Sequence, residues 1–548
     1  MRRQIIKRIT GISIVLLLFV LGVFAGETEK SSPAFTDTDL LPWPHYVRDS
    51  HPRMDYRLYR LYRVYREEGV RAAEEYAGNK GIVWRGGMVD VQIHAPTPAH
   101  PGVPEDAAVP AAAIPIGSFD RLLKDPAVRY ISAVPKPVEL DFVTEGVQVT
   151  ATNVWQERVP ARADASPVKV AVIDAGFEGY EDLLGSELPD SVTAVSFLAD
   201  GGMGESPHGT GCAEIVHDMA PEAALYLLPI DSFTMLIPAL NYCVDNGIDV
   251  ISMSLGFYGT GASDGTGYLC NLMQYIYENR ITWVMAGGND AGRHWSGLPA
   301  DPDGDGWINF SEDDEIYECD GRQGRRYGVF VDWEDWGLWD GRTYTGSGQD
   351  FDIYLFYWDG VDWQMIDRSE NIQDGDDFPY ESMFGDILQP GRYGIGIKRV
   401  RGNRQVRLHL VSPGSSSLGG IVNMEHVVPE GSIYGGATSR HAVIVGAFNW
   451  YDLALTGYSS WGPTRDGRVK PDIASPTQVS CHSYGEYGMG GTSAAAPHVA
   501  GAIALIRSRL PFFAFEDMVS ILNVRAVDEG EPGKDNLWGV GRLYLALH

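Results

Sequence analysis

Five short, continuous apolar runs recur along the chain between residues 168 and 447. Runs without alternation are typical of parallel strands that are covered on both faces. The longer stretches between them, such as Phe233–Asn246 and Gly267–Asn279, have the composition of helices. Alternation of strand and helix predicts an α/β fold with a parallel sheet flanked by helices. The five predicted strands are Val168–Ile173, Leu225–Ile230, Val250–Leu255, Ile281–Ala286 and Ala442–Ala447.

A long segment, residues 293–431, breaks this alternation. It begins with an acidic stretch and continues with apolar and polar residues in turn, separated by many turn residues. A period of two is typical of strands that face a core on one side only. We therefore expect an antiparallel β-sandwich over about 315–412, inserted into the α/β domain. Its clearest strands are Phe351–Leu355, Arg392–Ile397 and Gln405–Leu410.

The N-terminal residues have the three-part pattern of a secretory signal peptide. Residues 1–8 carry four basic side chains and no acidic one, Ile9–Phe24 is apolar, and Val23-Phe24-Ala25 resembles a cleavage site. We expect residues 1–25 to be a signal peptide and the protein to be secreted. The alternative is an uncleaved anchor in the cell envelope, because the apolar run is nearly long enough to span a membrane. Without such an anchor we expect no stable membrane association.

Residues 26–145 have the pattern of a leader region with α+β character. Asp55–Tyr76 lacks proline and predicts a helix with a solvated basic face. Ala95–Pro115 is rich in proline and alanine and predicts an irregular linker. Phe119–Ile131 then predicts a short helix followed by a strand.

Charge and composition exclude some functions. The 548 residues include 43 basic and 73 acidic side chains, a net charge of −30. Nucleic-acid binding draws on clustered basic charge, so we expect no nucleic-acid partner. With 44% apolar residues, the chain is suited to two or three packed domains. Five cysteines are too few for a disulfide scaffold, although a Cys243–Cys270 bridge stays open in an exported protein.

Three short motifs carry the candidate chemistry. Ser493 follows a glycine-rich turn and opens a predicted helix, whose N-terminal dipole favours a developing negative charge. Asp174 follows the first apolar run in Val-Ile-Asp-Ala-Gly, and His208 opens a helix with His-Gly-Thr-Gly. Ser493 alone could be an ordinary helix N-cap. The three motifs together, in the chain order Asp174, His208, Ser493, resemble those of the subtilisin-like serine proteases (subtilases, peptidase family S8).

The resemblance implies a role for each residue. Ser493 is the nucleophile, and His208 is the base that takes its proton and later protonates the leaving amine. Asp174 fixes the imidazole tautomer and stabilises the imidazolium. Asn289 follows a buried strand and resembles the family's oxyanion donor, beside the Ser493 backbone N–H. The plain alternative for Asn289 is a turn residue.

The resemblance also implies how a polypeptide substrate is held. Ser254, Leu255 and Gly256 resemble the strand that pairs with the extended substrate backbone, although a core role is the alternative for Leu255. The motifs assign residues 146–292 and 432–548 to a catalytic domain. Residues 26–145 resemble the family's inhibitory propeptide in position and in the helix–strand that ends in Val128–Val134.

The inserted segment carries a motif of its own. Residues 301–312 match the twelve-residue calcium loop of EF-hands at every defining position. We expect a structural calcium ion, although an acidic solvated turn is the alternative. The predicted ligands are the side chains of Asp301, Asp303, Asp305, Asn309 and Glu312 and the backbone carbonyl of Trp307.

These observations lead to one main hypothesis and one alternative. The main hypothesis is a secreted serine endopeptidase of the subtilase type, made as a precursor whose propeptide is an intramolecular inhibitor. The alternative is a protease-like surface or matrix protein that binds its partners through the inserted sandwich. A lipase or esterase is disfavoured, because Gly-x-Ser-x-Gly and the order Ser, Asp, His are both absent.

Overall fold

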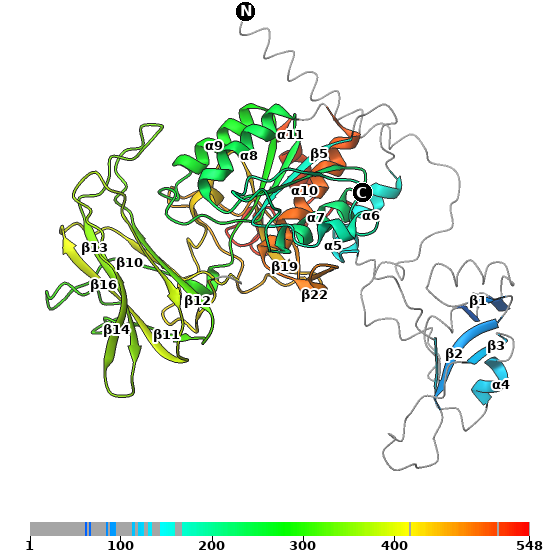
Figure 1. Ribbon diagram of the computed structural model, residues 1–548, viewed down its shortest axis with the longest axis horizontal. Helices are drawn as coiled ribbons and strands as arrows, with labels where there is room; N and C mark the ends of the chain where they lie inside the picture. The colour runs from blue at the N-terminus through cyan, green and yellow to red at the C-terminus, as the bar shows by residue number, and fades with distance from the viewer. Residues whose placement is uncertain are drawn as a thin grey trace, which may run out of the picture. The chain divides into compact units, whose positions relative to one another are not determined.

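The computed structural model describes residues 143–158, 167–415, 418–511 and 514–546, together with short stretches of the leader region. The chain divides into two compact units, Met1–Glu139 and Leu140–His548 (Figure 1). The signal-peptide prediction and most of the leader prediction lie outside the described residues. In the part of the chain that is described, none of the helices combines the length and the apolar content that crossing a membrane would need.

The described part of the first unit is a small antiparallel sheet with a helix, preceded by helical residues at 61, 62, 65 and 66 within the predicted Asp55–Tyr76 helix. Strand β2 (Met88–His94) pairs with β1 (Trp84–Arg85), β3 (Ala112–Pro115) and β4 (Tyr130–Ala133). Helix α4 (Phe119–Lys124) precedes β4, as the sequence predicts for this stretch. The α+β character expected of the leader is therefore present in its described residues.

The second unit is built on a seven-stranded parallel sheet, in the order β20-β19-β9-β8-β5-β7-β6. The predicted α/β fold class is thus confirmed. Almost every residue of its inner strands is buried, because helices cover both faces. The strands are β5 (Lys169–Asp174), β6 (Thr193–Ala194), β7 (Ala224–Pro229), β8 (Val250–Met253), β9 (Thr282–Ala286), β19 (Val443–Asn449) and β20 (Ile473–Thr477).

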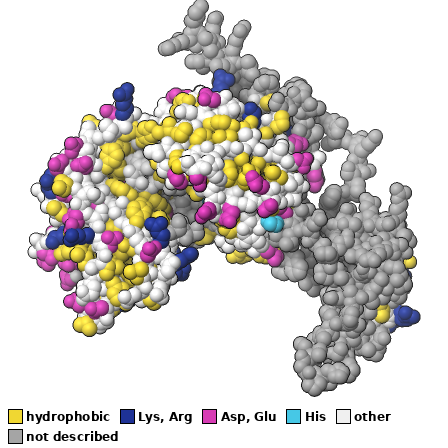
Figure 2. All heavy atoms as spheres, in the orientation of Figure 1, with side chains coloured by type: hydrophobic (Ala, Val, Ile, Leu, Met, Phe, Trp, Pro, Cys, Tyr) yellow, Lys and Arg dark blue, Asp and Glu magenta, His cyan; other side chains and the backbone are white. Residues whose placement is uncertain are grey.

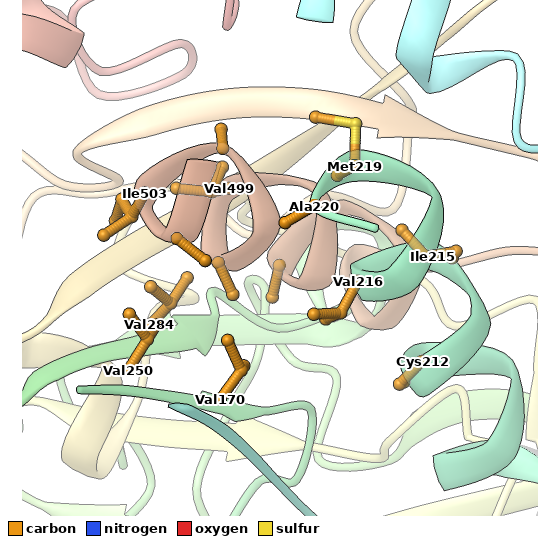
Figure 3. Close-up of a cluster of buried hydrophobic side chains, with 14 of the residues drawn as sticks. Val170, Cys212, Ile215, Val216, Met219, Ala220, Val250, Val284, Val499 and Ile503 are labelled. Carbon is orange, nitrogen blue, oxygen red and sulfur yellow. The ribbon is translucent and has the colours of Figure 1, made fainter. Parts of the chain in front are cut away.

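Two layers of helices complete this α/β sandwich. Helices α8 (Phe233–Asp245) and α9 (Tyr268–Glu278) pack on one face. Helices α7 (His208–Met219) and α10 (Thr492–Arg509) pack on the other, against valines of the sheet such as Val170. Figure 3 shows this second layer, where α7 and α10 lie side by side over the strands. Both helices therefore begin from fixed positions beside the sheet, which matters because each opens with a candidate catalytic residue.

Two segments that are distant in sequence close this unit. The short helices α5 (Gly146–Val149) and α6 (Thr152–Arg158) lie near its beginning. The Leu545 N–H donates to the Thr150 carbonyl at 2.7 Å, and the Trp155 indole donates to the Leu545 carbonyl. The Thr144 hydroxyl bonds the His498 Nε2 on α10 at 2.8 Å. The helix that carries Ser493 is thus tied to the first described residues of the unit.

The inserted segment forms two antiparallel sheets that face each other across an apolar core. One sheet has the order β10-β17-β12-β15 and the other β14-β13-β16-β11-β18. The predicted inserted sandwich is thus confirmed. Its strands are β10 (His294–Gly297), β11 (Tyr317–Gly321), β12 (Arg326–Trp333), β13 (Asp350–Trp358), β14 (Trp363–Ser369), β15 (Tyr380–Asp386), β16 (Gly391–Arg401), β17 (Leu408–Val411) and β18 (Ile421–Val422).

The sandwich is joined to the α/β part by a buried ion pair. Arg465 donates two hydrogen bonds to Asp332 of β12, at 2.6 and 2.8 Å, and the two side chains are 9% and 8% exposed. On its outer surface the sandwich presents apolar side chains such as Met365 and Val361 among charged ones (Figure 2). The insertion is thus held against the α/β part on one side, and its other side exposes both apolar and charged side chains.

Candidate active site

Asp174 and His208 meet at one end of the parallel sheet. Asp174 is the last residue of β5 and is fully buried, and its Oδ1 lies 2.8 Å from the His208 Nδ1. His208 opens α7. The next residue must be glycine, since a Cβ on Gly209 would lie only 2.5 Å from the Gly176 carbonyl oxygen. The His-Gly sequence therefore lets the helix approach the aspartate closely enough for the hydrogen bond.

The aspartate sets the protonation behaviour of this histidine. Burial disfavours the charged imidazolium, but the charge of Asp174 and its hydrogen bond outweigh that effect and raise the pKa of His208. Asp174 Oδ1 also accepts the backbone N–H of Ala175 at 2.8 Å, which fixes the carboxylate. Since Nδ1 faces Asp174, Nε2 is the ring nitrogen left for proton exchange with another group.

Ser493 lies at the beginning of α10, next to both elements. Gly491 precedes the helix with a φ of 82°, a backbone conformation that favours glycine. The Ser493 carbonyl accepts a hydrogen bond from the Ser254 hydroxyl at 3.0 Å and from the Cys212 thiol at 3.5 Å. Cys212 lies one turn after His208 on α7, so the Ser493 backbone lies near the first turns of the helix that carries His208.

Asn289 follows β9 and is oriented by the residue before Ser493. Its Oδ1 accepts both the backbone N–H and the hydroxyl of Thr492, at 2.8 and 3.0 Å. Its amide nitrogen must then point away from Thr492. A Cβ built on Gly491 would lie 3.1 Å from the Asn289 Nδ2 and 3.5 Å from the Ser493 backbone nitrogen. The Asn289 amide nitrogen and the Ser493 backbone nitrogen thus lie near one another, which is compatible with the two oxyanion donors that the resemblance implies.

The three predicted substrate-binding residues directly follow β8. Ser254 and Leu255 are partly buried, while Gly256 is exposed, with no atom within 4 Å of the place that a Cβ would occupy. Ser254 is the member of the three that bonds the nucleophile segment. The open space at Gly256 is where an extended chain could approach the strand backbone.

Two other histidines and the cysteines have structural surroundings. His498 is buried and bonds Thr144 and the Ala494 carbonyl, and burial lowers its pKa to about 4. His217 is partly buried on α7 with its pKa lowered by burial. All five cysteines are buried free thiols, so the Cys243–Cys270 bridge that the sequence left open does not form.

The predicted calcium loop lies beside the sandwich. Asp301, Asp303 and Asp305 each bring a carboxylate oxygen within 4.8 Å of the others. Asn309 is 6% exposed, and its Oδ1 has no hydrogen-bond partner among the described residues. These oxygens fit a hard cation. Glu312, in contrast, is exposed and does not belong to the aspartate group.

A different acidic residue lies near these aspartates. Burial and the charges of Asp305, Asp303 and Asp301 together raise the pKa of Glu315. The Trp307 backbone N–H donates to the Asp305 Oδ1 at 2.8 Å, and Trp307 forms a β-bridge with Lys398 of β16. The sequence template could not identify Glu315, because it assumes the helix that follows an EF-hand loop, whereas here β11 follows.

Three residues of the active-site region were missed from the sequence. Thr492 orients Asn289, and Tyr258 donates a hydrogen bond to Asp290, the residue after Asn289, at 2.7 Å. Adjacency to Ser493 and to Asn289 was the available signal for Thr492 and Asp290. Nothing in the sequence pairs Tyr258 with a residue 32 positions later.

The fold and this arrangement define a class: an α/β protein that presents an aspartate, a histidine and a serine from one end of a parallel sheet. Comparison with known proteins agrees. The model of the family described as "Subtilase family" (Peptidase_S8) matches residues 395–541. Over these residues the chain is similar to the subtilase family, the family that its motifs resemble.

Curated relatives match short parts of the chain. It is 31% identical over 86 residues to an extracellular serine protease of Serratia marcescens, which is 14% of this chain and 8% of that protein. It is 35% identical over 101 residues to the minor extracellular protease Vpr of Bacillus subtilis (strain 168), which is 16% of this chain and 12% of that protein. The matches thus span only about a tenth of these relatives' length.

A solved structure matches far more of the fold. The CspB protease of Clostridium perfringens superposes with a TM-score of 0.51 at 16% identity, over 73% of this chain and 97% of that chain. At this level of identity the likeness concerns the fold.

Proposed function

We propose that the protein is a secreted serine endopeptidase that cleaves polypeptides through an acyl-enzyme. In this mechanism His208 Nε2 takes the proton of the Ser493 hydroxyl as its oxygen attacks the scissile carbonyl. Asp174 stabilises the imidazolium that forms. Asn289 Nδ2 and the Ser493 N–H then donate to the oxyanion. His208 returns the proton to the leaving amine, and water releases the acyl group by the same steps in reverse.

One observation carries this proposal. The buried Asp174 holds the Nδ1 of His208 at 2.8 Å, so the imidazole has a fixed orientation, a raised pKa and a free Nε2. A histidine with a purely structural role would have little need of a buried carboxylate that fixes its ring at the end of a parallel sheet. The similarity to the subtilase family and to extracellular proteases supports the reaction and the secretion.

Casein hydrolysis tests the proposal. The exported protein should hydrolyse casein, a serine-directed phosphonate should block hydrolysis, and its label should be found on Ser493. The Ser493→Ala variant should neither hydrolyse nor take the label. Failure of the leader-free wild-type protein to cleave any polypeptide would contradict the proposal and favour a surface or matrix binding protein.

We further propose that residues 26–145 are a propeptide that inhibits the enzyme until it is cleaved. Their position before the catalytic unit supports this, as does the small α+β structure of β1–β4 and α4. Ser493→Ala expressed in a protease-deficient host should keep its leader, whereas the wild type should lose it. Removal of the leader from the Ser493→Ala protein in that host would rule out self-processing.

We also propose that residues 301–312 bind one structural calcium ion. The gathered carboxylates of Asp301, Asp303 and Asp305 and the unpartnered Asn309 Oδ1 support it. The carbonyl of Trp307 belongs to the proposed ligand set, and so does the carboxylate of Glu312, which has to move toward the aspartates to reach the ion. The ion would neutralise part of the 26 acidic against 12 basic side chains of the insertion.

A further inference from the structure

The segment that follows the substrate-binding residues is held by the inserted sandwich. The ring of Tyr258 stacks on Phe330 of β12, with centroids 4.5 Å apart and planes 23° apart. Farther along, the Tyr344 hydroxyl accepts the Ala262 N–H at 3.0 Å and bonds the Thr266 hydroxyl at 2.8 Å. Tyr344 and Phe330 both belong to the insertion, so its position determines the position of this segment.

The same segment also reaches the loop that carries Asn289. The Tyr258 hydroxyl donates to the Asp290 Oδ2 at 2.7 Å. Asp290 is only 3% exposed, and its backbone N–H donates to the Ser460 hydroxyl at 3.0 Å. The side chain of Asn289 is oriented by Thr492, but the backbone of its loop is anchored through Asp290.

The Asp290 carboxylate is buried, so its negative charge depends on the few groups that contact it. Burial raises its pKa to about 6, and the Tyr258 hydrogen bond, the charge of Arg293 and the Gly414 N–H act against this rise. Arg293 and Gly414 belong to the insertion, and Tyr258 is stacked on it. Every group that favours the Asp290 carboxylate is therefore part of the insertion or in contact with it.

We propose that Tyr258 is a positioning residue through which the inserted sandwich holds the Asn289 loop in place for the oxyanion. This inference rests on the proposed peptidase function. Tyr258 does not touch the reacting atoms. It acts through Asp290 on the backbone that sets where the Asn289 amide lies, and small errors in that place cost rate.

A double-mutant cycle with Asn289 tests the inference. Tyr258→Phe keeps the stacked ring but removes the hydroxyl. Its kcat on an extended peptide substrate should fall about tenfold, because the misplaced amide stabilises the transition state less well. KM should stay within about twofold, since the interaction lost is made only in the transition state.

In an Asn289→Ala background, Tyr258→Phe should lower kcat no further, because its target is already gone. A second tenfold fall in that background would overturn the inference, and so would a lower unfolding temperature with unchanged kcat. Asp290→Asn keeps an acceptor for the Tyr258 hydroxyl and should retain most of the activity, whereas Asp290→Ala should resemble Tyr258→Phe.

A matched pair of substitutions tests whether the sandwich holds Tyr258 in place. Phe330→Leu removes the ring on which Tyr258 stacks. Phe384→Leu removes a neighbouring ring, 5.1 Å from Phe330 and 49% exposed. We expect kcat to fall several-fold in Phe330→Leu and to be unchanged in Phe384→Leu, and equal effects would overturn the proposal. Absence of hydrolysis by the wild type would defeat the peptidase proposal itself, whereas an active wild type with a fully active Tyr258→Phe defeats only this inference.

Discussion

The parallel sheet and the inserted sandwich bury their strands in different ways. In β8, Val250–Met253 is buried at every position, and β5 is nearly so. In β11 and β13, buried residues alternate with half-buried ones. Helices cover both faces of the parallel sheet, whereas the sandwich sheet that holds β11 and β13 turns one face to its partner sheet and one face outward. The other sandwich sheet is covered on both faces around β12 and β17, which are buried at nearly every position.

This difference decides where chemistry can be placed. In a parallel sheet all strands end at the same edge, and side chains just beyond that edge come together. Asp174 ends β5, Ser254 follows β8 and Asn289 follows β9. Neighbouring antiparallel strands end at opposite edges, so they do not bring the residues that follow them together in this way. The candidate metal ligands of the insertion instead lie in one loop, residues 301–312. The candidate catalytic residues are therefore gathered in the α/β part, while the sandwich supports the segment next to them.

The largest expected effect is the loss of activity in a variant of the α/β part that leaves the stability of both regions unchanged. Ser493→Ala should lower kcat by about 10⁶, a magnitude borrowed from subtilisin itself, because nucleophile and base act as one unit. Unfolding of both regions, followed by calorimetry, should be unchanged. Peptide hydrolysis that persists in the purified variant would show that catalysis does not depend on the α/β site.

Asp174→Asn should lower kcat by about 10⁴. It should also shift the pH profile of kcat/KM. Hydrolysis needs neutral His208, so activity rises as pH rises through the His208 pKa, which Asp174 raises above its ordinary value near 6.5. Without that charge the midpoint of the acid limb should move to lower pH. Asp182→Asn, at an exposed position of the same unit, should leave the profile unchanged, and an unshifted midpoint in Asp174→Asn would contradict the role of Asp174.

Arg465→Met should weaken the joint between the two regions. It leaves Asp332 buried without its partner, which should lower the free energy of unfolding by about 3–5 kcal/mol. Adding Asp332→Leu should recover part of this loss, because no charge is then left buried. Arg440→Met removes an exposed ion pair and should have almost no effect. Denaturant unfolding measures all three variants, and equal stability of Arg465→Met and the wild type would show that the two regions are not joined through this pair.

Calcium should have the smallest effect and act on the sandwich alone. At a calcium concentration of about 100 Kd, the free energy of unfolding should rise by about 2.7 kcal/mol. Asp303→Asn should lose this increase. Asp376→Asn, in another acidic group of the insertion, should keep it. Calorimetry with and without chelator measures the change, and an equal calcium response in both variants would place the ion elsewhere.

The sequence predicts the α/β part better than the sandwich, for physical reasons. The five apolar runs correspond to β5, β7, β8, β9 and β19 within about two residues, since burial on both faces leaves a strong pattern. The strand predicted at Gln405–Leu410 begins only at Leu408. The edge strand Thr193–Ala194 was missed because both residues are exposed.

The candidate site shows the same limit. Motifs and chain order suffice to predict Asp174, His208 and Ser493 as candidates, because each lies at the end of a predictable element. The contact between Tyr258 and Asp290 depends on how an insertion of more than a hundred residues docks. Glu312 was chosen from a template whose following helix is absent here, so no feature of the pattern pointed to Glu315.

The hydrogen bonds of Leu545 to Thr150 and Trp155 have a consequence for the timing of folding. During synthesis, Trp155 is made 390 residues before Leu545, and Thr144 is made 354 residues before His498. Helix α10, and the nucleophile with it, arrives after every strand of the parallel sheet. Long-range closure of this kind is slow. The nascent chain must therefore keep an incomplete, apolar sheet face covered by other means until α10 has been made.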